Sequence, residues 1–219
     1  MLLRKPHLLA LIFVLNLAAL AQRGAAPTVA FTCDFPGSDP SHYSISVASD
    51  GHASYVSDGK LAQGSEPDAP YTQDFTLPAA SAGHIFDLAK QAHYFEGKID
   101  SGNKKIASTG AKTLSYKDSQ KNTSANYNYS PILAIQELTT WFQSLSATLE
   151  FGRRIEFEHH YQKLALDDEF KSLEDMVSRG DAVEVSVIAP ILQKVLADPT
   201  VMNTVRARAQ RLLNAASAK

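Results

Sequence analysis

The run Tyr43-Ser-Ile-Ser-Val47, followed by Asp50-Gly51 and Ala53-Ser-Tyr-Val56, decides the fold of the N-terminal part of this chain. Apolar and polar residues alternate in both runs, so one face of each run is apolar, as in a half-buried strand. The Asp-Gly pair is typical of a tight hairpin turn, because glycine tolerates the positive φ that such a turn demands. We therefore predict two antiparallel strands joined by a turn at Gly51.

Further strand-like runs extend the predicted sheet on both sides of this hairpin. They lie at residues 29–35, 71–77, 111–116 and 124–129. One helix interrupts them, because apolar residues recur at helical spacing after Pro78, at Ala82, Ile85, Phe86, Ala89 and Ala92. The first 130 residues thus predict a small antiparallel sheet with one helix packed on it.

The apolar period changes at Ser130, where a long helix is predicted to start. Ser130 before Pro131 is a suitable helix start, because proline is favoured at the first helical position. An apolar stripe follows at Ile132, Ile135, Leu138, Phe142, Leu145 and Leu149. This helix either continues through Gly152 to Tyr161 or kinks there.

The rest of the chain is predicted to be helical as well. One helix starts at Asp167 and ends near Gly180, since glycine is favoured just past a helix end. Residues 182–197 are helical in composition, with a break or bend expected at Pro190. The last helix is expected to start at Asp198-Pro199.

These patterns predict an α+β fold, with a small antiparallel sheet and one packed helix followed by an all-helical C-terminal region. We predict a signal peptide at 1–21, a flexible leader at 22–28, a sheet-plus-helix domain at 29–149 and a helical C-terminal region at 150–219.

The N-terminus has the three parts of a secretory signal: basic Arg4 and Lys5, an apolar run over residues 8–20, and the small-residue exit Ala19-Leu20-Ala21. We expect cleavage before Gln22. The apolar run is shorter than the about 20 residues that a membrane span needs, and no later stretch is long and apolar enough. The sequence therefore predicts an exported protein, periplasmic or extracellular, with no membrane span after cleavage.

Composition excludes one class of partner and bounds the fold. Loss of residues 1–21 removes two bases and no acid, which changes the formal charge from −2 to −4. A nucleic-acid binder is usually clearly basic, so we expect no nucleic-acid partner. Cys33 is the only cysteine. It therefore forms no internal disulfide, and we interpret it as a small apolar residue on a strand.

Two segments match the Ser-x-x-Lys motif of penicillin-recognising acyl enzymes. They are Ser57-Asp-Gly-Lys60 and Ser101-Gly-Asn-Lys104. That chemistry needs the serine at a helix start with the lysine one turn later, and both matches lie in predicted turns. The catalytic residues thus stay unknown from the sequence.

Glu156-Phe-Glu158-His159-His160 concentrates residue types that bind metals. Glu156 and His160 have the i, i+4 spacing of a helical metal pair, which is also the spacing of an ordinary surface contact. Adjacent histidines on a helix point about 100° apart and converge poorly. We predict no metal and no cofactor, and assign no role to the remaining histidines near the sheet, His42, His52, His84 and His93.

Two parts of the chain show a resemblance to known proteins. The strands around Asp50-Gly51, the strand at Phe75 and the helix before Tyr94-Phe95 resemble uncharacterised exported bacterial domains, which have no assigned activity. The last helix, with Val205-Arg206, Ala209 and Leu212-Leu213, is similar to the second helix of a HEAT-type repeat. One copy is visible where a solenoid needs about three, so we expect a helical hairpin that offers a contact surface.

The sequence as a whole favours a non-enzymatic binding or interaction protein of the cell envelope, with a protein partner at the helical C-terminal region. The alternative is an envelope hydrolase whose site is assembled from scattered serine, histidine and acidic residues.

Overall fold

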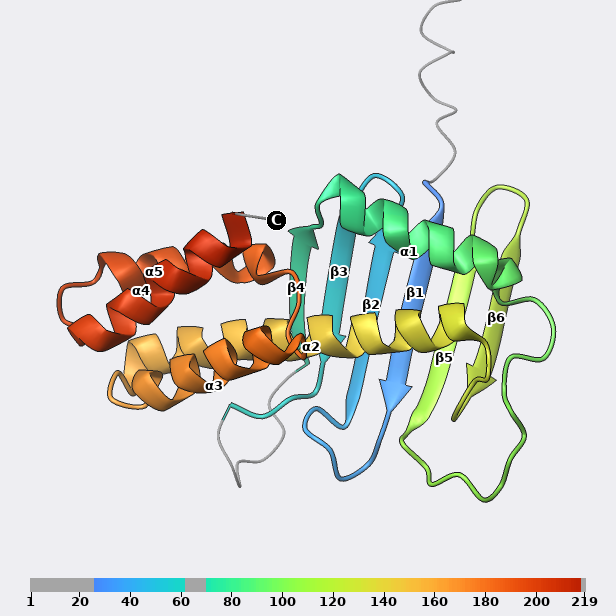
Figure 1. The fold of residues 1–219 in the computed structure, drawn as a ribbon, viewed down its shortest axis with the longest axis horizontal. Coiled ribbons are helices and arrows are strands. Elements are labelled where there is room, and N and C mark those ends of the chain that lie inside the picture. Colours follow the sequence, from blue (N-terminus) through green and yellow to red (C-terminus); the bar gives the residue numbers. More distant parts are fainter. Residues whose placement is uncertain (1–25, 62–69, 218–219) are drawn as a thin grey trace, which may run out of the picture.

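The computed structural model describes residues 26–61 and 70–217. The predicted signal peptide and most of the predicted leader lie outside these residues. The α+β prediction is confirmed, since a six-stranded antiparallel sheet is followed by helices (Figure 1). The strands follow the order β4-β3-β2-β1-β5-β6. Their bounds are β1 Thr28–Asp34, β2 His42–Ala48, β3 His52–Ser57, β4 Tyr71–Thr76, β5 Ala111–Lys117 and β6 Asn122–Tyr127.

The predicted hairpin is the β2–β3 pair, in which Val47 lies opposite Ala53. Gly51 in its turn has a φ of 89°, the left-handed conformation that favours glycine. The Gly51 carbonyl accepts a hydrogen bond from the Leu77 amide at 2.9 Å, which ties the turn to the end of β4. The hairpin is therefore held at both ends, by its own ladder and by the neighbouring strand.

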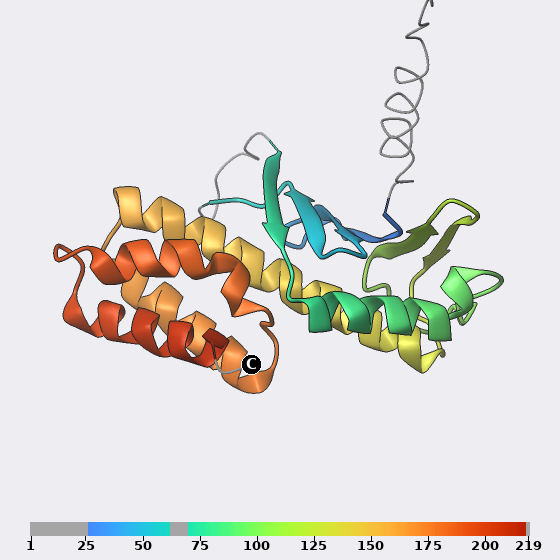
Figure 2. The ribbon, with the colours of Figure 1, turned by 90° about the horizontal axis from the view of Figure 1, so that it is seen from above.

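Two helices cover one face of the sheet. α1 (Ala79–Gln91) is the predicted helix after Pro78, and it is followed by the short 3₁₀ turn η2 (His93–Phe95). The first half of α2 (Leu133–Tyr161) lies beside α1 on the same face (Figures 1 and 2). The inward side chains of the central strands are fully buried beneath these helices, among them Val29, Phe31, Ile45, Val47 and Leu114.

α2 is one continuous helix, so the structure decides for continuation at Gly152. Its second half extends past the β4 edge of the sheet and packs against the helices that follow it in the chain (Figure 2). A Cβ added at Gly152 would lie 2.5 Å from Cγ2 of Ile188, so glycine permits close packing here. The predicted domain boundary at residues 149 and 150 therefore falls inside a helix that the two parts of the chain share.

The bundle consists of the second half of α2 with α3 (Leu166–Arg179), the 3₁₀ turn η3 (Val185–Ile188), α4 (Ala189–Ala197) and α5 (Asn203–Ser217). α4 and α5 form the expected helical hairpin. We expected Pro190 to break or bend a helix over residues 182–197. It lies instead in the first turn of α4, where proline is favoured.

Two helix starts differ from prediction. α2 begins at Leu133 rather than at Pro131, and Ser130 Oγ accepts a hydrogen bond from the Ile132 amide in the turn that precedes it. α5 begins at Asn203 rather than at Pro199. The cause there is Asp198, whose carboxylate accepts hydrogen bonds from the amide and hydroxyl of Thr200 and so holds the chain in a turn.

Candidate functional site

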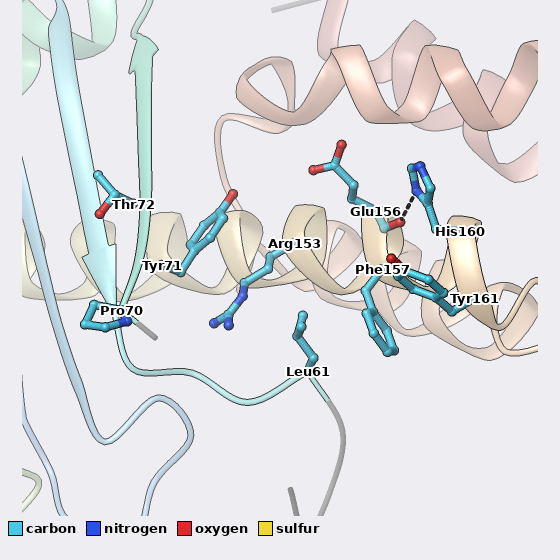
Figure 3. A pocket seen from close by; sticks show the side chains of 9 residues that line it. All are labelled: Leu61, Pro70, Tyr71, Thr72, Arg153, Glu156, Phe157, His160 and Tyr161. Carbon is cyan, nitrogen blue, oxygen red and sulfur yellow. Dashed lines mark hydrogen bonds between the residues drawn. The ribbon is translucent and has the colours of Figure 1, made fainter. Parts of the chain in front are cut away.

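A groove lies where the sheet meets the helical bundle, between β4 and the outer face of α2 (Figure 3). We call it the junction groove. Its volume is about 460 Å³, and it is lined by Leu61, Pro70, Tyr71, Thr72, Arg153, Glu156, Phe157, His160 and Tyr161. The groove thus combines aromatic side chains with one acid, Glu156, and two residues of basic type, Arg153 and His160.

The polar groups of the junction groove are mostly held by the protein itself. The Arg153 guanidinium lies 4.8 Å from the centre of the Tyr71 ring and donates a hydrogen bond to the Gly59 carbonyl at 2.7 Å. Glu156 pairs with Lys194 at 3.2 Å. The rings of Phe157 and Tyr161 lie 5.1 Å apart along α2. The groove therefore offers a fixed aromatic surface more than a set of free acid–base groups.

A buried polar network lies behind the groove and joins β3 to α2. Glu150 is 4% exposed, and its Oε1 accepts hydrogen bonds from the hydroxyls of Tyr55 at 2.8 Å and Ser57 at 2.5 Å. The Tyr55 hydroxyl also lies 2.9 Å from Ser146 Oγ. Burial and the nearby Glu150 carboxylate raise the pKa of Tyr55, so its hydroxyl stays a donor. This network holds the sheet to the shared helix.

The far end of the bundle, where the α2–α3 and α4–α5 turns meet, carries exposed apolar side chains. We call this surface the distal tip, and it consists of Tyr161, Leu164 and Met202. Tyr161 is 75% exposed and Leu164 is 84% exposed. Lys163 and Thr200 join the two turns that carry these side chains, and large apolar side chains exposed in one region of a surface often mark a contact site.

Ion pairs hold the two turns of the distal tip together. Asp198 accepts hydrogen bonds from Lys163 at 2.6 Å and from His159 at 2.9 Å, and Lys163 also donates to Thr200. Lys163, followed by the hydrogen bonds from Thr200 and His159, lowers the pKa of Asp198 below its ordinary range. Asp198 thus stays ionised, and the apolar side chains of the tip are mounted on a fixed base.

The structure places neither Ser-x-x-Lys match in a nucleophile arrangement. Ser57 is 1% exposed and donates to Glu150, while the backbone amide of Lys60 binds Asp39 at 2.9 Å. Ser101 Oγ accepts a hydrogen bond from the amide of Asn103 in an exposed turn. Neither serine begins a helix, as this chemistry requires.

The candidate metal residues on α2 diverge. Glu156 and His160 line the junction groove, but the Glu156 carboxylate pairs with Lys194 and His160 Nδ1 lies 3.1 Å from the Glu156 backbone carbonyl. His159 instead contacts Asp198 in the bundle. Within residues 26–61 and 70–217, no group of three or more histidine, cysteine or acidic side chains could hold a metal ion.

The other histidines lie apart on the surface of the sheet domain. His42 Nδ1 lies 2.5 Å from Asp34, and His84 Nε2 lies 3.0 Å from Glu137. His52 begins β3 and His93 begins η2. Cys33 is buried on the inner face of β1, and burial raises the pKa of its thiol. The structure does not bring these residues together into one site.

Sequence reasoning missed Glu150 and the distal tip. Glu150 lies among apolar residues in a helix. A buried acid needs hydrogen-bond partners, and the sequence does not show which distant residues supply them. The tip had a weak sequence signal, because Leu164 lies outside the apolar stripe of the long helix. The third tip residue, Met202, comes from a turn 38 residues further along the chain.

The chain matches no known protein family, and no curated protein is significantly similar to it in sequence. Among the helices of the described residues, none has the length and apolar character that crossing a membrane requires.

Proposed function

We propose that the mature chain is an exported, non-enzymatic protein of the cell envelope that binds a protein partner through the distal tip of its helical region. The support for export is the N-terminal segment with its basic start, apolar run and Ala19-Leu20-Ala21 exit. The single observation that carries the binding proposal is the exposure of large apolar side chains at the tip, on two turns that Lys163 joins.

The tip has the features of a small binding surface. Protein interfaces depend on a few large apolar or aromatic side chains, and Tyr161 and Leu164 are of this kind. The hydrogen bonds of Lys163 and Asp198 fix the turns beneath them, so little conformational entropy is lost when a partner binds. Lys163 and Thr200 add polar groups in the same two turns, and the rim of an interface carries groups of this kind.

The junction groove extends this surface along α2. Tyr161 belongs to both surfaces, and its ring lies next to that of Phe157 within the groove (Figure 3). A partner segment that covers the tip can therefore continue towards Tyr71 along one aromatic path. The occupant that we propose is a polypeptide with apolar side chains, since the path offers rings and few free charges.

The experiment uses the full mature chain with two variants. The double variant Tyr161→Ser/Leu164→Ser removes the two most exposed side chains of the tip and changes no buried side chain. Leu133→Ser is the matched control, because Leu133 is 78% exposed at the other end of the same helix. Each chain carries a photo-crosslinker at the exposed residue Gln162, which leaves the Lys163 contacts intact. It is incubated with envelope extract, and the crosslinked partner is then purified and its dissociation constant is measured.

We expect the wild type and Leu133→Ser to bind the purified partner equally. Loss of one central apolar side chain typically costs about 2 kcal/mol, which corresponds to about a thirtyfold weaker dissociation constant. The double variant should therefore lose binding at micromolar concentrations. Equal binding by the double variant, or an equal loss in Leu133→Ser, would contradict the proposal.

A further inference from the structure

A second cavity lies at the opposite edge of the sheet, between the end of β6 and the first turns of α2. It has a volume of about 470 Å³ and we call it the lysine pocket. The described residues that line it include one cation, Lys112, and no acid; the others carry hydroxyl or amide groups, among them Tyr127, Asn128, Gln136, Thr140 and Gln143. Its volume is at the lower end of the range of small-molecule sites.

Lys112 is an unusual residue at its position on β5. It points to the covered face of the sheet, between inward-facing neighbours such as Leu114, and it is only 3% exposed. Its Nζ donates to Thr109 Oγ1 at 2.8 Å, to the Asn128 carbonyl at 3.0 Å and to the Gly110 carbonyl at 3.3 Å. The ammonium therefore has hydrogen-bond acceptors, and the longest of these bonds is the easiest to replace.

The charge of Lys112 has no counter-charge in the described part of the chain, where no carboxylate lies within ion-pair distance of its Nζ. Burial lowers the pKa of Lys112 accordingly. Its Nζ also lies 6.0 Å from the centre of the Tyr127 ring. A buried cation with only neutral partners is costly, and an anion beside it recovers part of that cost. The pocket thus has an electrostatic preference for a negatively charged ligand.

The α2 wall of the pocket carries three polar side chains, of which one is hydrogen-bonded to the protein and two are available to a ligand. Gln136, Thr140 and Gln143 follow one another on one face of the helix. The Gln136 amide donates to the Tyr129 hydroxyl at 3.0 Å and to the Ser130 carbonyl at 2.9 Å, so it is fixed. Thr140 and Gln143 are exposed and make no side-chain hydrogen bond within the described residues, so both can bind a ligand.

We propose that the lysine pocket binds a small sugar acid, a molecule with one carboxylate and several hydroxyl groups. The carboxylate lies beside Lys112 in place of the Gly110 carbonyl contact, and the ligand hydroxyls bind Thr140 and Gln143. The half-exposed ring of Tyr129 provides a face for the apolar side of the sugar ring. One buried cation matches one carboxylate, and the absence of acids from the described lining disfavours a cationic ligand.

The test is an NMR titration of the mature protein with D-glucuronate, with D-glucose as the uncharged control of the same shape. We expect glucuronate at millimolar concentrations to shift the amide signals of residues 109–112 and 140–143, and glucose to bind at least about tenfold more weakly, as a charged hydrogen bond predicts.

Two sets of variants test the α2 side and the Lys112 side of the pocket separately. Thr140→Ala/Gln143→Ala changes only exposed side chains, so it leaves the fold intact, and we expect it to weaken glucuronate binding several-fold. Lys112→Met should abolish the preference for glucuronate over glucose, whereas Lys117→Met on the exposed end of the same strand should retain it. Three results would overturn the proposal: no shift at the pocket, equal affinity for both sugars, or an unchanged affinity in the Thr140→Ala/Gln143→Ala variant.

Discussion

Replacing Glu150 by alanine should cost this protein a large part of its stability. Glu150 is the one acceptor that Tyr55 and Ser57 on β3 share, and it stands on the helix that the sheet and the bundle also share. Its loss leaves two buried hydroxyls short of an acceptor at the point where these two parts of the molecule are joined.

The size of the effect follows from the two hydrogen bonds, and the loss of the negative charge 3.8 Å from the buried Arg153 guanidinium adds to it. A hydrogen bond to a charged group contributes about 1.5–3 kcal/mol. The Tyr55 hydroxyl keeps Ser146 as a neighbour at 2.9 Å, which reduces its share of the loss. We therefore expect Glu150→Ala to lower the free energy of unfolding by about 3–5 kcal/mol, against a total that is typically about 5–15 kcal/mol. Glu150→Gln keeps an acceptor oxygen but removes the negative charge beside Arg153, so it should cost about 1–3 kcal/mol, less than Glu150→Ala.

The assay is urea unfolding followed by circular dichroism and by the fluorescence of Trp141, the only tryptophan. Glu137→Ala is the matched control, since Glu137 is an acid on the same helix with a half-exposed side chain paired with His84. This control should change the free energy of unfolding by less than about 1 kcal/mol. If Glu150→Ala is no more destabilising than Glu137→Ala, the network does not join the two parts of the fold as we argue.

Two further changes test the packing and electrostatics of the bundle. Burial, with a smaller effect of Glu169, raises the pKa of Glu158 to about 7 from an ordinary value of 4.5, so the folded state binds this proton more tightly than the unfolded state. The free energy of unfolding should therefore fall as pH rises from about 4.5 to about 7. Glu158→Gln should flatten the pH dependence of the urea midpoint in this range. Parallel pH profiles for the wild type and Glu158→Gln would argue against the raised pKa. Gly152→Ala should destabilise the protein by about 1–3 kcal/mol through its clash with Ile188, despite the better helix propensity of alanine. In an Ile188→Ala background the same change should become neutral or stabilising, and an undiminished penalty in thermal unfolding would place the strain elsewhere.

The fold was largely predictable because its signals are local. The alternation around Gly51 and the apolar stripe from Ile135 to Leu149 depend on residues within a few positions of one another, and each period matches one kind of backbone. The helix starts at Leu133 and Asn203 were displaced because capping depends on which side chain reaches which amide. The Asp198 carboxylate accepts a hydrogen bond from the Thr200 amide and so forms a turn where a helix start was predicted. The residue types alone do not show which amide this carboxylate binds.

The candidate sites were not predictable, because their members are far apart in the chain. Ser57 suggested a nucleophile by its motif with Lys60, yet its actual partner is Glu150, which lies 93 residues further along. The alternation of the strand at 111–116 places Lys112 on the same face as Leu114 and Tyr116, but it does not show that the lysine is buried or which oxygens its ammonium meets. These sites could not be predicted because their residues are far apart in the chain, and not because the residue types are unusual.

The amino-acid sequence by itself determined the class of fold, the presence of a hairpin at Gly51, and the long helix that follows Pro131, because hydrophobic periodicity acts over a few residues. It also carries the N-terminal pattern on which the expectation of export rests. Only the tertiary structure decided that this helix runs unbroken from sheet to bundle, that Glu150 and Lys112 are buried, and that Tyr161, Leu164 and Met202 are left exposed. Burial, exposure and partnership are properties of the packed chain, since they depend on segments that meet only after folding.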